Sequence, residues 1–285
     1  EQKLVGIVTL RSLLLADPNQ LVEEMVNRDV VWVDEKLDQE EVSQKLSQLR
    51  LKAIPVCDSE GRMKGIVTVD DIISVVQEEA TEDIQKLGGT EALDEPYLLI
   101  PILSMVKKRA GWLVVLFLGE MLTATAMGYF EHEISKAVVL ALFIPLIISS
   151  GGNSGSQAAS LIIRSLALKE VKPSNWFKIF YREILVGLFL GSILGIIGMI
   201  RIWLWPTRDT LYGEHFLLIS YTVGASLVGV VLWGSLAGSM LPLFLKRLGL
   251  DPATASTPFV ATLVDVTGIV IYFSIASLLL GGVLL

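Results

Sequence analysis

The chain has 285 residues, of which 52% are hydrophobic, and its formal net charge is −7. Soluble domains of this length rarely average so apolar a composition. Its single cysteine, Cys57, excludes an intramolecular disulfide, and with only two histidines the chain offers no cysteine-based metal site. Residues 1–111 hold 21 acids and 13 bases, whereas residues 112–285 hold 9 and 10. We therefore predict two parts, one in water and one in lipid.

An internal repeat marks the soluble part. The segment Gly65–Asp71 is partly repeated at residues 6–12, so the chain is expected to begin inside the first copy, as a fragment without its true N-terminus. The second copy predicts strands at 30–33, 53–56 and 63–69 and helices at 37–49 and 70–79. A turn at 58–61 joins the last two strands as a hairpin, and Asp70 is expected to cap the last helix.

An acidic run follows this copy. Its members are Glu78, Glu79, Glu82, Asp83, Glu91, Asp94 and Glu95. On a helix over 78–87 the first four occupy neighbouring positions. Such a run is most often a solvated helix face, but clustered oxygens also suit Mg²⁺ or Ca²⁺ at low affinity.

Five segments are long and apolar enough to cross a bilayer, which takes about 20 residues. They are residues 112–130, 137–163, 184–200, 216–245 and 259–285. Ten basic residues flank them on one side and three on the other. Because basic residues gather on the cytoplasmic side, we expect a cell-membrane protein with its N-terminus inside and its C-terminus outside.

Two acids, Glu120 and Asp265, lie well inside these spans. An acid at the centre of a span costs ~3 kcal/mol on the insertion scale, so it usually faces water or a partner. No base lies deep enough to pair with either, which favours a cation path over an anion path. Ala261 precedes Asp265 by one turn, so the Ala261 carbonyl and the Asp265 side chain fall on one stripe. For Glu120, a neutral structural role is an equally good interpretation.

The second span contains Pro145 and then Ser149-Ser150-Gly151-Gly152-Asn153-Ser154-Gly155-Ser156-Gln157. Proline and three glycines weaken a helix, and backbone groups freed in a membrane need other partners. We therefore expect a broken helix that lines a hydrated cavity, with Gly151, Gly152 and Asn153 on the ion path. The alternative is close packing through small residues. No base accompanies the serines, so no enzyme is predicted.

The repeated segments resemble a pair of CBS domains, and the chain as a whole resembles the MgtE family of Mg²⁺ channels. The most specific parts are Gly151 to Gln157 and the run from Asp251-Pro252-Ala253 through Pro258 to Asp265. The resemblance implies an α/β CBS module, a connecting helix and a five-helix α-helical transmembrane domain. The implied domains are residues 1–27 as the remnant of the first CBS domain, 28–80 as the second, 81–111 as the acidic connecting helix with the juxtamembrane segment, and 112–285 as the pore domain.

The resemblance also implies a function. Two subunits would form a pore lined by the second and fifth spans, and Asp265 of each, helped by the Ala261 carbonyl, would hold a hydrated Mg²⁺. Cytoplasmic Mg²⁺ would bridge acids and close the pore; the matching positions are Asp71, Glu79, Glu82, Asp83 and Asp251. Thr68 and Asp71 match the residues that hold the ribose of an adenine nucleotide such as ATP, although Asp71 could equally cap a helix.

Two other functions fit parts of this pattern. The first is a CBS-regulated anion channel, which the unpaired Asp265 disfavours. The second is a membrane-tethered nucleotide or Mg²⁺ sensor without transport, which needs neither buried acids nor a weakened second span. Divalent cations and a second copy of the chain are the expected partners, and nucleic acid is not.

Overall fold

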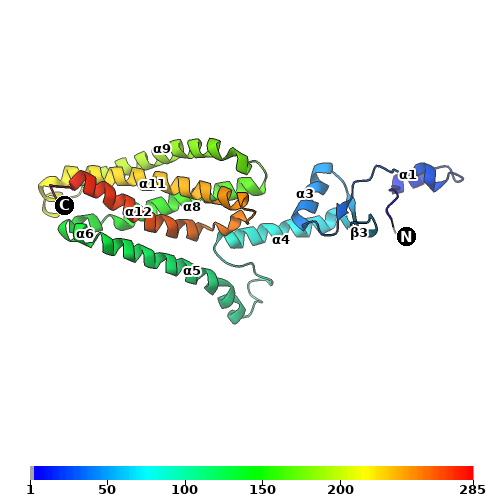
Figure 1. The fold of residues 1–285 in the computed structure, drawn as a ribbon, viewed down its shortest axis with the longest axis horizontal. Coiled ribbons are helices and arrows are strands. Elements are labelled where there is room, and N and C mark those ends of the chain that lie inside the picture. The colour runs from blue at the N-terminus through cyan, green and yellow to red at the C-terminus, as the bar shows by residue number, and fades with distance from the viewer. Residues whose placement is uncertain (1–2, 285) are drawn as a thin grey trace. The chain divides into compact units, whose positions relative to one another are not determined.

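The computed structural model describes residues 3–284 (Figure 1). The outermost positions of the expected first CBS remnant and of the last span, residues 1, 2 and 285, lie outside the described residues. The chain divides into two compact units, of which the first ends at Thr81 and the second begins at Glu82. Each unit has a hydrophobic core of its own.

The first unit is built around a three-stranded sheet. Its strands are β1 (Val33–Asp34), β2 (Ala53–Cys57) and β3 (Met63–Thr68), in the order β1-β2-β3. β1 and β2 are parallel, and β2 and β3 pair antiparallel, which confirms the predicted hairpin. Helix α3 (Gln39–Leu49) places Val42 and Leu46 on Val33 and Ile54, and these four side chains form the core.

The first strand is shorter than predicted. It starts at Val33 rather than at residue 30, because Val33 is buried whereas Val31 and Trp32 remain exposed. The residues before it form two short helices, α1 (Leu10–Leu15) and α2 (Val22–Met25), and an isolated bridge between Ile7 and Asn27.

Asp58 fixes the hairpin turn between β2 and β3. Its Oδ1 atom accepts hydrogen bonds from the backbone N–H groups of Arg62, at 2.9 Å, and of Glu60, at 3.0 Å. Lys64 Nζ lies 3.3 Å from the Oδ2 atom of Asp58. The Arg62 backbone bond foremost, and then Lys64, hold the pKa of Asp58 below its ordinary value, although burial partly opposes them.

Helix α4 runs without interruption over Val69–Leu87. It therefore contains both the predicted helix at 70–79 and the first residues of the expected connecting helix. The chain is then non-helical until Ile102, so the segment 81–111 contains the end of one helix and the start of another.

The second unit is helical. Its long helices are α5 (Ile102–Tyr129), α8 (Ile144–Ala167), α9 (Trp176–Trp203), α11 (Phe216–Arg247) and α12 (Thr257–Leu280). Short helices join them: α6 (Glu131–Lys136), α7 (Val138–Ala141), α10 (Arg208–Leu211), and the 3₁₀ turns η1 (Pro173–Asn175), η2 (Gly213–His215) and η3 (Pro252–Thr254). Each long helix is apolar enough to cross a membrane, which confirms the five predicted spans. In Figure 1 they run side by side.

Helix α11 lies at the centre of this unit. Glycines on α9 allow that helix to come close, since a Cβ at Gly191 would lie 2.7 Å from Val228 Cα. On its other side α11 packs against α8 and α12, whose apolar side chains join it in the core. Helix α5 contacts α12 and has no buried residue. Its apolar surface therefore remains open to lipid or to a second chain.

Candidate functional site

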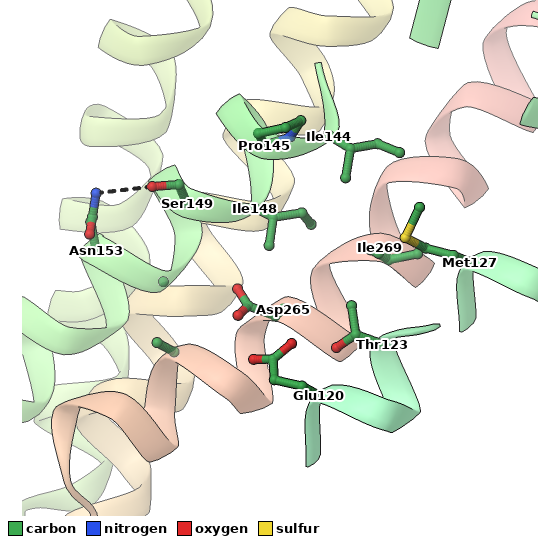
Figure 2. Close-up of a pocket in the computed structure, with 12 residues that line it drawn as sticks. Glu120, Thr123, Met127, Ile144, Pro145, Ile148, Ser149, Asn153, Asp265 and Ile269 are labelled. Atoms are coloured by element: carbon green, nitrogen blue, oxygen red, sulfur yellow. Dashed lines mark hydrogen bonds between the residues drawn. The ribbon is translucent and has the colours of Figure 1, made fainter. Parts of the chain in front are cut away.

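A cavity of about 440 Å³ lies between α5, α8 and α12 (Figure 2). Its lining residues are Glu120, Thr123, Met127, Ile144, Pro145, Ile148, Ser149, Gly152, Asn153, Ala261, Asp265 and Ile269. The fold brings together here four of the residues that were predicted to lie on the ion path: Asp265, Ala261, Gly152 and Asn153.

Helix α12 carries Asp265 into this cavity. Ser256 caps the helix by accepting a hydrogen bond from the Phe259 N–H, and Pro258 occupies its first turn, where the missing N–H of proline is not needed. Trp112 Nε1 of α5 donates to Ser256 Oγ at 2.9 Å and so ties the beginning of α12 to α5. Asp265 follows two turns later and points into the cavity (Figure 2).

Gly152 forms the opposite wall on α8. A Cβ placed on it would lie 3.5 Å from Ala261 Cβ and 3.7 Å from Asp265 Oδ1. The glycine therefore leaves the space in front of the Asp265 carboxyl group open. Within residues 3–284, the side chain of Asn153, next to it, makes a single long hydrogen bond, of 3.5 Å from Nδ2 to Ser149 Oγ, so its amide can turn to a ligand.

The expected break in the second span is wrong. Helix α8 is continuous from Ile144 through all three glycines to Ala167. The irregular backbone lies before it, at residues 142–143. Pro145 stands in the first turn of α8, where the missing N–H of proline breaks no helical hydrogen bond.

The other two glycines, Gly151 and Gly155, stand where α8 packs too closely against its neighbours for a side chain. A Cβ at Gly151 would lie 2.5 Å from Val230 Cγ1 and 2.9 Å from Val264 Cγ1, and Gly151 does not line the cavity. A Cβ at Gly155 would lie 3.0 Å from the Gly234 carbonyl oxygen of α11. These two glycines let α8 and α11 touch backbone to backbone, as small residues do in membrane helices.

A second cavity, of about 710 Å³, adjoins the first at Ala261. Its lining residues are Ser156, Gln157, Ser160, Leu161, Thr257, Pro258 and Ala261. Ser149, Asn153, Ser156 and Ser160 thus follow one another along one face of α8, from the first cavity into the second. Sequence reasoning had not separated this polar stripe from the neighbouring serines, although its helical spacing is visible in the sequence.

The predicted regulatory acids lie in both units. In the first unit, Glu79 accepts a hydrogen bond of 2.6 Å from Gln39 Nε2. In the second, Lys86 forms ion pairs with Glu82 and with Asp251, whose Oδ2 atom lies 2.8 Å from Lys86 Nζ. Among residues 3–284, no group of three or more His, Cys, Asp or Glu side chains is arranged to hold a metal ion.

Lys86 was missed by sequence reasoning. Burial alone would lower the pKa of its ammonium group, but the hydrogen bonds to Asp251 and Glu82 raise that pKa above the ordinary lysine value. The side chain is therefore charged throughout the physiological range. It already supplies a positive charge to two of the acids that were expected to bind Mg²⁺.

The predicted nucleotide turn is a helix cap in this structure. Asp71 Oδ2 accepts hydrogen bonds from the Thr68 N–H at 2.8 Å and from Thr68 Oγ1 at 2.7 Å. These bonds, the backbone one first, lower the pKa of Asp71. Asp70 lies inside the first turn of α4, so the expectation that it caps the helix is wrong. The first copy is capped differently, because there the Ser12 N–H donates to Thr9 Oγ1 at 3.1 Å.

Residues 144–275, which contain α8 and most of α12, match the family model of MgtE, a divalent cation transporter. Residues 22–78 match that of the CBS domain. The chain is thus similar to the MgtE family over the helical unit. Its resemblance to that family is thereby confirmed, as is the layout of a CBS module before a five-span helical domain.

Curated relatives match nearly the whole chain. The magnesium transporter MgtE of Thermus thermophilus is 42% identical over 281 residues, which are 99% of this chain and 60% of the relative. That of Enterococcus faecalis is 37% identical over 98% of this chain and 59% of its own length. The chain thus spans about 60% of the length of these MgtE proteins.

Enzymes match a smaller part. An inosine-5'-monophosphate dehydrogenase of Thermoplasma acidophilum is 29% identical over 57% of this chain and 32% of the enzyme. Such matches concern the CBS domain, and the relatives that match along the whole chain are named transporters, in line with the prediction of a non-enzyme.

One solved structure, the cytosolic domain of the Mg²⁺ channel MgtE in complex with ATP, is 44% identical over 26% of this chain and 30% of that chain. Its TM-score is 0.25, too low to support a comparison of folds.

Proposed function

We propose that the chain conducts Mg²⁺ across the cell membrane as a homodimer, with Asp265 of both subunits holding the hydrated ion. The observation that carries the proposal is the cavity in which Asp265 faces Gly152 and Ala261 within an apolar helical domain. The related MgtE proteins are named magnesium transporters, which supports the choice of ion.

The chemistry of this cavity suits Mg²⁺. This ion gives up its water reluctantly and is usually held through one or two carboxylates while it keeps several waters. The small residues Gly152 and Ala261 leave room for those waters, and the polar side chains of Ser149 and Asn153 can hydrogen-bond to them. A two-fold axis, the commonest symmetry of oligomers, would bring a second Asp265 to the same ion.

The orientation rests on the basic residues. With ten on one side and three on the other, the N-terminal CBS module lies in the cytoplasm and the C-terminus outside. Cytoplasmic Mg²⁺ then reaches the acids along α4 and before α12.

These acids form a Mg²⁺ brake in this proposal. Binding of Mg²⁺ at Asp71, Glu79, Glu82, Asp83 and Asp251 would favour the closed pore. The ion pairs of Lys86 refine this picture, since Mg²⁺ has to compete with the lysine for Glu82 and Asp251. Competition with a tethered charge makes each site weak, so the brake should respond to millimolar rather than micromolar Mg²⁺.

The turn at Thr68 and Asp71 is the proposed nucleotide site of the CBS module, with an adenine nucleotide such as ATP as its ligand. Both hydrogen bonds from Thr68 use Oδ2, so a ribose hydroxyl could donate to Oδ1 of the same carboxylate. Calorimetric titration with ATP tests this site. We expect binding that Asp71→Asn weakens, and equal binding by the variant would remove Asp71 from the site.

Mg²⁺ flux tests the central proposal. The full chain is reconstituted in liposomes that contain a Mg²⁺-sensitive dye, and Asp265→Ala and Asp265→Asn are compared with wild type. Glu131→Gln is the matched control, because Glu131 is an exposed acid outside the cavity. We expect both Asp265 variants to lose flux and the control to keep it. Wild-type flux through correctly folded Asp265→Ala would overturn the pore assignment.

A further inference from the structure

A second carboxyl group shares the cavity with Asp265. Figure 2 shows Glu120 of α5 pointing toward Asp265 of α12, and both residues line the cavity. None of the cavity-lining residues in the described part of the chain is Lys, Arg or His, so no fixed positive charge balances them there. Facing carboxyl groups without a base are a favourable place for a cation.

The packing of α5 on α12 holds Glu120 at this place. A Cβ at Gly119 would lie 2.6 Å from Thr262 Cγ2, so the two helices approach closely one turn before Asp265. The neighbours of Glu120 on α5 are exposed and apolar, namely Phe117, Leu118 and Met121. A carboxylate is disfavoured against lipid, and the cavity is the polar place within its reach.

Thr123 supplies an independent sign of a ligand. Its Oγ1 atom is buried and, within residues 3–284, has no hydrogen-bond partner. It lies one turn after Glu120 and lines the same cavity. Buried hydroxyl groups are nearly always hydrogen-bonded, so an unsatisfied one beside two carboxyl groups indicates a place for water. A water molecule in the shell of a bound ion would satisfy it.

We propose that Glu120 is a second carboxylate of the ion path, which binds the water shell of a divalent cation together with Asp265. This inference rests on the proposed function and adds a residue from the first span to a site otherwise built from the second and fifth. Each subunit then brings two negative charges to the ion. Monovalent cations gain less from that charge, so Glu120 contributes to the selection of divalent over monovalent ions.

The test measures Mg²⁺ dependence and selectivity in reconstituted liposomes. Glu120→Gln keeps the size of the side chain but removes its charge, Glu120→Asp keeps the charge, and Glu131→Gln is the control. For Glu120→Gln we expect a roughly tenfold rise in the half-saturating Mg²⁺ concentration, as for one lost charge-assisted contact, and weaker discrimination against K⁺. Glu120→Asp should keep most of the Mg²⁺ affinity and most of the discrimination against K⁺, which a purely structural role would not predict.

The outcomes separate this inference from the proposed function. Loss of flux in Asp265→Asn together with wild-type half-saturation and selectivity in Glu120→Gln overturns the role of Glu120 alone. Wild-type flux in Asp265→Asn overturns the proposed function itself. If Glu120→Gln does not fold, Glu120→Asp decides, because it keeps the charge but is one methylene group shorter. A rise in half-saturating Mg²⁺ well below about tenfold, with selectivity retained, supports the inference, and wild-type half-saturation contradicts it.

Discussion

Lys86, in the last turn of α4, donates a hydrogen bond of 2.8 Å from Nζ to Oδ2 of Asp251, which caps the turn before α12. The two residues are 165 positions apart in the chain. Thr257, the first residue of α12, adds a bond of 3.2 Å from Oγ1 to the Leu87 carbonyl oxygen. The end of α4 is thereby attached to the beginning of the helix that carries Asp265.

Replacing Lys86 by Gln should strengthen inhibition by cytoplasmic Mg²⁺. The change removes the tethered charge that competes for Glu82 and Asp251, and a charge-assisted hydrogen bond is worth roughly 1.5–3 kcal/mol, or about tenfold or more in affinity. We expect the inhibition curve of single-channel open probability to move to lower Mg²⁺ by about that factor.

The control for this experiment is Lys64→Gln, which removes a lysine from the β-hairpin of the first unit. If the inhibition curve of Lys86→Gln instead moves to higher Mg²⁺, Lys86 itself stabilises the closed pore. An unmoved curve would exclude Glu82 and Asp251 from the brake.

The neighbouring glycines Gly151 and Gly152 should respond differently to the same change. Gly151→Ala forces a methyl group against Val230 and Val264, and such overpacking typically costs about 1–3 kcal/mol. Gly152→Ala meets Ala261 at an ordinary contact distance of 3.5 Å and should leave stability nearly unchanged. Thermal unfolding in detergent measures both, and equal loss in the two variants would contradict the assigned faces of α8.

Mg²⁺ flux should depend on the size of the side chain at position 152. Gly152→Leu places a large side chain in front of Asp265 and should abolish Mg²⁺ flux in protein that is still folded. Normal conduction by Gly152→Leu would show that ions do not pass between α8 and Asp265.

Asp58 predicts a pH dependence of the first unit. Its folded-state pKa lies below 3.8, so the charged form contributes stability above the unfolded pKa, and this contribution is lost as the pH falls through the folded value. Asp58→Asn should therefore destabilise the hairpin equally at pH 7 and pH 5. The difference from wild type should shrink only below about pH 4, near the ordinary aspartate pKa.

Hydrogen exchange of the amides in β2 and β3 measures this difference. Glu60→Gln is the control, because Glu60 is an exposed acid in the same turn whose side chain pairs with Arg62. A difference that grows as the pH falls from 5 to 3 would contradict the assigned sign.

Much of the fold could be predicted because its signals are local. A span of about 20 apolar residues and a strand-turn-strand pattern are both readable from neighbouring residues, and the five helices and the β2–β3 hairpin follow them. Asp265 stood out for the same reason, since an unpaired acid within an apolar run is visible without knowledge of its surroundings.

The sequence by itself determined which segments are long and apolar enough to cross a membrane and that two acids lie within them, whereas the tertiary structure decided which side chains meet. Gly151 and Gly152 are adjacent and identical in the sequence, but a rotation of about 100° between neighbouring helix positions turns one toward α11 and the other toward Asp265. The ion pair of Lys86 with Asp251 and the cavity shared by Glu120 and Asp265 join residues far apart in the chain. Only the packing of helices brings such groups together, because helix periodicity fixes a face but not the helix that it faces.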